Sequence, residues 1–293
     1  MNNIKNFLTL FILLSITSYS QTNYEFYGAL KLNRNDNTII TYRLVFTENN
    51  GKINGYSVTD LDGVHETKNS ISGSYDESKK LFSFQEKEIL YTKSKFDENS
   101  FCFVNFSGKV KLVENTSKLE GNFKGFYNNK TKCIDGSIVL IGSNKIYSIV
   151  SRVNNKIQKS KKIDQKTKET SNPVKLLDSL KINKLTKEQN LNVFWESNIL
   201  KLDIWDNGQE DGDIINLFHN DKLILSGYAV TNKKKTLDIS LMGKNDVFKI
   251  VAINEGKIKP NTAKLELHDA NRSFELLATL NKDENASITI VRK

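Results

Sequence analysis

The sequence has few of the residues and spacings that mark common catalytic centres. Its three histidines, His65, His219 and His268, are far apart and do not occur in an H-E-x-x-H or similar metal-binding spacing. G-x-S-x-G segments and phosphate-binding glycine loops are also missing. His268 and Asp269 are neighbours on a predicted strand, so their side chains should point to opposite faces. The sequence therefore predicts no catalytic residue.

Long hydrophobic runs are missing beyond the N-terminus. The apolar run Phe7–Ile16 follows Lys5 and is shorter than the ~20 residues that a membrane span needs. We interpret residues 1–20 as a signal peptide cleaved after Ser20, because Ser18 and Ser20 are small enough for signal peptidase. The mature chain should then be secreted or periplasmic, without a transmembrane segment. A retained N-terminal anchor helix is the alternative.

Cysteine is scarce, with only Cys102 and Cys133 in the chain. Such a pair can close into a disulfide in the oxidising environment that an exported protein meets. We predict this disulfide, which should stabilise the fold by on the order of 3 to 4 kcal/mol. The alternative is two buried free thiols, and a C-x-x-C redox pair is missing.

The positive net charge of +9 is concentrated in the middle of the chain. Residues 151–189 hold 11 basic and 4 acidic side chains, whereas the segments on either side are nearly neutral. This lysine-rich tract is too polar to bury much surface, so we predict a flexible linker with a short helix after Pro173. It could also hold to anionic groups of the cell envelope. A structured basic face with interleaved aromatics is missing, so we expect no nucleic-acid partner.

Residues 21–150 alternate between apolar and polar side chains in runs separated by turn sequences. YEFYGALKL, TIITYRLVFT and KINGYSVT are examples, and ENNG and DLDG are the turns that follow the last two. About eight such strands with short connections predict consecutive antiparallel neighbours that close on themselves. The fold class is therefore all-β, and this segment is predicted to be an antiparallel up-and-down barrel.

Residues 190–293 continue the alternation in seven or eight longer strands, which predict a β-sandwich of immunoglobulin-like proportions. The sandwich has no cysteine of its own. Its DNG-x-x-DGD turn and PNTA segment resemble those of C-terminal sandwich modules in secreted bacterial envelope proteins, a resemblance that implies no activity. The glycine-aromatic rhythm of the first domain (GYS, GSY, GFY) resembles lipocalin-like and avidin-like barrels. That resemblance implies a small ligand in the barrel mouth.

Two carboxylates in the first domain are candidate ligand-binding residues. In FSFQEKEIL, strict alternation puts Glu86 and Glu88 on the same face as Phe82 and Phe84. If that face is internal, the carboxylates lie among aromatic rings and need partners. The alternative is that a bulge or the register turns both glutamates outward.

An acid-rich loop in the second domain is a candidate metal site. WDNGQEDGDIINL contains Asp206, Glu210, Asp211 and Asp213, and Glu255 could join them from another loop. An EF-hand is excluded because neither glycine of the loop is followed by a glutamate at the required position. An irregular loop can still bind calcium through such oxygens. The alternative is a pair of ordinary turns whose carboxylates cap backbone groups.

We therefore expect an exported, non-catalytic binding protein. Its barrel would bind a small ligand or glycan, and its sandwich would be adhesion-like, with calcium as the one cofactor considered. A second hypothesis is a hydrolase of envelope polymers that uses carboxylates of the first domain. A third is a structural or partner-docking component of the envelope.

Overall fold

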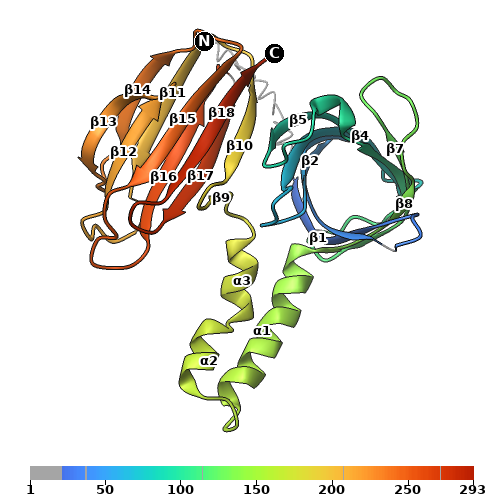
Figure 1. The fold of residues 1–293 in the computed structure, drawn as a ribbon. Helices are drawn as coiled ribbons and strands as arrows, with labels where there is room; N and C mark the ends of the chain where they lie inside the picture. The colour runs from blue at the N-terminus through green and yellow to red at the C-terminus, as the bar shows by residue number, and fades with distance from the viewer. Residues whose placement is uncertain (1–21, 37, 114, 207, 271) are drawn as a thin grey trace, which may run out of the picture.

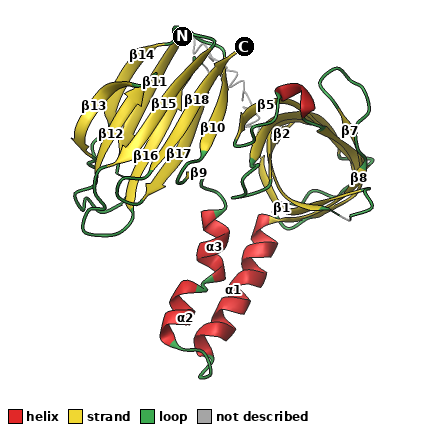
Figure 2. Cartoon of the chain, in the orientation of Figure 1, coloured by secondary structure: helices red, strands yellow, loops and turns green. Residues whose placement is uncertain are grey.

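A computed structural model describes residues 22–36, 38–113, 115–206, 208–270 and 272–293. The predicted signal peptide at residues 1–20 lies outside the described residues. The described chain consists of a barrel, a helical segment and a two-sheet module (Figure 2). Strands predominate in the barrel and in the two-sheet module. The predicted all-β class is confirmed. None of the described helices is long and apolar enough to cross a membrane.

The N-terminal module is a closed antiparallel barrel, as the sequence predicts. In the described residues each of its eight strands pairs with the next one along the chain, and β8 pairs with β1. Figure 1 looks along the barrel, so that its strands form a ring. The strands are β1 (Thr22–Leu32), β2 (Ile39–Asn49), β3 (Lys52–Thr59), β4 (Thr67–Asp76), β5 (Leu81–Thr92), β6 (Phe103–Lys109), β7 (Lys118–Phe126) and β8 (Gly136–Gly142). A 3-10 turn, η1 (Glu98–Ser100), lies between β5 and β6.

Aromatic side chains fill one end of the barrel. The Phe46 ring centroid lies 5.1 Å from that of Tyr24, 5.9 Å from that of Phe26 and 5.1 Å from that of Phe82. All four side chains are buried, because strand alternation turns them to the interior. They lie where β1 and β5 begin and β2 ends. A packed core therefore occupies this end of the barrel.

The lysine-rich segment is helical in the structure, where the sequence predicts a mostly flexible linker. It forms α1 (Ser143–Lys159), α2 (Gln165–Thr170) and α3 (Pro173–Ser179). Ile146, Val150 and Ile157 of α1 are half-buried at helical spacing, and α1 packs on α3 beside the barrel (Figure 1). Asn172 caps α3 by accepting hydrogen bonds from the next turn. The apolar stripe of α1 begins before residue 151, so the charge composition of residues 151–189 alone could not reveal this helix.

The C-terminal module is a sandwich of two five-stranded sheets. In the described residues the strand orders are β13-β12-β15-β18-β10 and β14-β11-β16-β17-β9. The first sheet contains β10 (Asn190–Trp195), β12 (Ile214–His219), β13 (Lys222–Ala229), β15 (Asn245–Ala252) and β18 (Asn285–Arg292). The second contains β9 (Lys184–Leu185), β11 (Ile199–Trp205), β14 (Lys235–Ser240), β16 (Asn261–His268) and β17 (Ser273–Leu280).

The inner faces of the two sheets share one hydrophobic core. Trp195 and Ile250 from the first sheet pack in the same cluster as Leu202 and Leu265 from the second. The sandwich has more strands than the sequence predicts, and it is mixed, since β10 runs parallel to β18 and β9 parallel to β17. Parallel pairs join strands that are distant in sequence, so local patterns do not reveal them.

The barrel and the sandwich are joined by a short stretch of strand pairing as well as by the helices. Tyr91 pairs with Val193 and Thr92 with Asn192, so the end of β5 lies antiparallel beside β10 and extends the first sheet of the sandwich into the barrel. The Tyr91 side chain is buried in the sandwich core. One barrel strand therefore contributes to both modules.

Candidate functional site

A β-bulge in β5 separates the two carboxylates that sequence alternation placed together. Ile71 of β4 pairs with Glu86, but the preceding residue, Ser70, pairs with Glu88, so Lys87 is the extra residue. A bulge reverses the alternation beyond it. Glu86 consequently points into the barrel and is buried, whereas the side chain of Glu88 is 40% exposed. Both alternatives given by the sequence are therefore realised, one by each glutamate.

Glu86 is the polar centre of the barrel interior. Its Oε1 accepts hydrogen bonds from the Tyr42 hydroxyl (2.8 Å) and the Ser57 hydroxyl (2.5 Å), and its Oε2 accepts one from the Val104 N–H (2.7 Å). Burial raises the pKa of Glu86, and these hydrogen bonds act in the opposite direction. Sequence reasoning missed Tyr42 and Ser57. The sequence feature that could have identified them is a hydroxyl group at a strand position that faces the barrel interior.

The barrel end opposite the aromatic core holds a cavity of about 750 Å³. Its floor includes Glu86 and Asn69, and its walls include Leu30, Phe103 and Phe123. Asn69 is 5% exposed, and its Oδ1 has no hydrogen-bond partner among the described residues. The volume lies within the range of roughly 300 to 1,000 Å³ that is usual for small-molecule sites. This end of the barrel therefore offers space for a ligand, and its lining includes a residue with an unpartnered acceptor.

The predicted disulfide is present and lies at the rim of this cavity. Cys102 precedes β6 and Cys133 precedes β8, and their Cα atoms are 6.1 Å apart. Both cysteines line the cavity. Another part of the rim carries Phe96, which is 66% exposed and stacks on His65 with ring centroids 5.6 Å apart. The bridge thus fixes two of the loops that surround the opening.

The acid-rich loop of the sandwich is more buried than a solvated turn. Asp206, Asp211 and Asp213 are at most 7% exposed, and each accepts a backbone hydrogen bond, from Gly208, Ile258 and Thr262 respectively. Burial, together with the charges of Asp211 and Asp206, raises the pKa of Asp213.

The loop does not bring all the predicted acids together. Glu210 is exposed, unlike the other three, and accepts a hydrogen bond from the Asn232 N–H (2.6 Å). Glu255 forms an ion pair with Lys259 (2.6 Å). The backbone-capping role predicted for a turn is therefore present, and Asp211 and Asp213 both lie beside Gly256.

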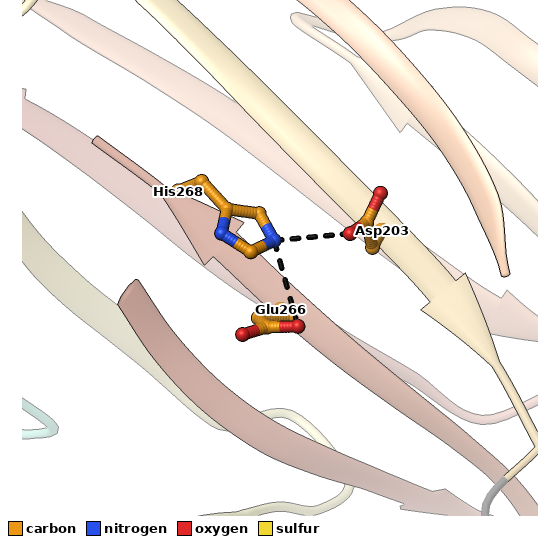
Figure 3. Close-up of side chains that lie close together, drawn as sticks. All are labelled: Asp203, Glu266 and His268. Carbon is orange, nitrogen blue, oxygen red and sulfur yellow. Dashed lines mark hydrogen bonds and ion pairs between the residues drawn. The ribbon is translucent and has the colours of Figure 1, made fainter. Parts of the chain in front are cut away.

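A second cluster on the outer face of the sandwich was missed by sequence reasoning. His268 Nε2 lies 3.0 Å from Asp203 Oδ2 and 3.5 Å from Glu266 Oε2 (Figure 3). Glu266 and His268 share one face of β16 because they are two residues apart, and Asp203 is the cross-strand partner of Glu266. The spacing E-x-H could have indicated two of the three residues. The third depends on strand register.

A lysine forms ion pairs with both carboxylates of this cluster. Lys234 Nζ lies 2.7 Å from Glu266 Oε2 and 3.9 Å from Asp203 Oδ2. Although burial acts against it, hydrogen bonds from Thr236 and His268 lower the pKa of Asp203. The three possible metal ligands of Figure 3 therefore form an ion-pair network, and a metal would have to displace the Lys234 ammonium group.

Comparison of the chain with protein-family models, curated proteins and solved structures finds no match. The closed eight-stranded barrel is of the general kind that the glycine-aromatic pattern indicated. No family assignment accompanies it.

Proposed function

We propose that this is an exported binding protein whose barrel takes up one small ligand. The observation that carries the proposal is the cavity of about 750 Å³ ending on a polar floor. Buried polar atoms are rarely left without a partner, yet Asn69 Oδ1 has none among the described residues. A hydrogen-bond donor on a bound molecule would satisfy it.

The cavity walls indicate the chemical class of the ligand. Apolar surface makes up the larger part of the cavity lining and includes Leu30, Phe103 and Phe123, while polar side chains such as Thr59 and His65 line the rest. We therefore place a mostly apolar ligand with an N–H or O–H group ahead of a glycan. The donor group would lie near Asn69 and the apolar body between the aromatic walls.

The hydrolase hypothesis has less support. Hydrolysis of glycosidic bonds uses two carboxylates that face the same substrate. Glu88 lies outside the barrel and pairs with Lys293 (2.6 Å), and Glu86 already accepts three hydrogen bonds. The Glu86 and Glu88 pair therefore cannot act together on a ligand in the cavity.

Probe binding tests the proposal. N-phenyl-1-naphthylamine is apolar and fluorescent and carries one N–H, so it should bind the mature chain saturably with one site per molecule. Ile40 lines the cavity, whereas its neighbour Ile39 is 68% exposed on the other face of β2. Ile40→Trp should place a bulky ring in the cavity and weaken binding at least about tenfold, and Ile39→Trp should leave binding unchanged. Equal binding by both variants would contradict the proposal.

The role of Asn69 is tested separately. Asn69→Leu should weaken binding of the N–H probe by about threefold to tenfold, the usual value of one hydrogen bond. The N-methylated probe has no donor and should bind the wild type and Asn69→Leu equally. If both probes lose the same affinity, the variant acts through cavity shape and the donor contact is wrong. Ligands copurifying with the chain, identified by mass spectrometry, decide between an apolar molecule and a glycan.

A further inference from the structure

Two carboxylates at one end of the sandwich each have one hydrogen-bonded oxygen and one bare oxygen. Asp211 Oδ2 accepts from the Ile258 N–H (2.8 Å), and Asp213 Oδ2 accepts from the Thr262 N–H (2.7 Å). The second oxygen of each, Oδ1, has no hydrogen-bond partner among the described residues. Because the residues are only 7% and 1% exposed, bulk water does not replace the missing partners.

The two bare oxygens both lie close to Gly256. A β-carbon placed on Gly256 would lie 2.5 Å from Asp211 Oδ1 and 2.8 Å from Asp213 Oδ1. Gly256 has φ +57°, in the left-handed region where glycine is favoured. The bare oxygens therefore meet where the backbone carries no side chain.

The carboxylates here have no counter-charge from the described part of the chain. None of Asp206, Asp211 and Asp213 forms an ion pair with a described lysine, arginine or histidine. The outer-face pair Asp203 and Glu266, in contrast, forms ion pairs with Lys234 in the same sandwich. Like charges held together in a buried setting repel each other unless a cation lies between them.

We propose that one calcium ion binds between Asp211 Oδ1 and Asp213 Oδ1. The donors are hard oxygens on irregular loops, which suit calcium, and no histidine or cysteine takes part that would favour zinc or copper. This set differs from the one expected from sequence, because Glu210 turns away to Asn232. The site is independent of ligand binding in the barrel.

Calcium at this position would tie two loops of the sandwich together. Asp211 and Asp213 belong to the loop between β11 and β12, while Gly256, Ile258 and Thr262 belong to the connection from β15 into β16. The ion would relieve the repulsion between the carboxylates, so its effect should appear as stability of the sandwich.

The test is thermal unfolding of the mature chain in calcium and in chelator, followed by tryptophan fluorescence, together with calorimetric titration of calcium. Calcium at about 100 times its Kd should raise the midpoint by about 5 °C or more. Titration should give one site per chain. Absence of both effects in the wild type, or an equal midpoint shift with magnesium, would overturn the assignment to calcium.

Three variants localise the site. Asp213→Asn and Asp211→Asn should each abolish the calcium-dependent shift, and their midpoints in chelator should not fall much, because a repulsive charge has been removed. Glu210→Gln, an acid of the same loop whose side chain lies apart, should keep the full shift. A shift retained by both asparagine variants, or lost in Glu210→Gln, would refute the placement.

Discussion

Removal of the Cys102–Cys133 disulfide should destabilise the barrel by about 4 kcal/mol. The bridge joins cysteines 31 residues apart, and constraining a loop of that length in the unfolded chain is worth about 3.7 kcal/mol in the chain-entropy model. The double variant Cys102→Ala/Cys133→Ala gives the difference directly. Because the bridge lies at the cavity rim, the variant should also bind the naphthylamine probe more weakly.

Urea unfolding with two signals measures this effect and assigns it to the barrel. Both tryptophans, Trp195 and Trp205, lie in the sandwich, so tryptophan fluorescence follows that module. Circular dichroism in the far ultraviolet follows both modules. The double variant should move the barrel transition to lower urea and leave the fluorescence midpoint in place.

Two results would refute this reasoning. A double variant within about 1 kcal/mol of the oxidised wild type would show that loop closure does not stabilise the barrel as calculated. An equal shift of the fluorescence midpoint would show that the two modules unfold as one unit through the β5 and β10 pairing. As a control, a reducing agent should reproduce the effect in the wild type and change nothing in the double variant.

Further predictions concern the barrel core and the charged groups. Because burial raises the folded-state pKa of Glu86 above its ordinary value of 4.5, the free energy of unfolding should fall as pH rises from there through the folded-state pKa. Glu86→Gln should remove this part of the pH dependence. Urea unfolding at a series of pH values tests it, and the same difference in free energy of unfolding between the two proteins at every pH would contradict it. Phe46→Ala should lower the free energy of unfolding by about 3 to 5 kcal/mol, measured with urea, whereas Val139→Ala on the exposed face should lower it by under about 0.5 kcal/mol. Lys234→Met should lower the free energy of unfolding by no more than about 1 kcal/mol, and by less at high salt, because that lysine is half-exposed.

The strand alternation carried most of the fold prediction. Buried apolar residues alternate in β2 (Tyr42, Leu44, Phe46) and in β15 (Phe248, Ile250, Ala252), so the sequence identified both strands and their inward faces. The same rule failed in β5, because a bulge at Lys87 depends on the register with β4 and not on the residues of β5 themselves. The helices of the linker were underestimated for a related reason. Their stability comes from α1 packing on α3, a contact that lysine content does not reveal.

By itself, the sequence determined the all-β class, the barrel and sandwich order, the cysteine pair and the acid-rich loop, because these depend on local periodicity and residue type. Only the tertiary structure decided which side chains meet: Glu86 with Tyr42 and Ser57, and Asp211 with Asp213 beside Gly256. Such meetings depend on strand register and loop packing, in which a shift of one residue turns a side chain to the other face.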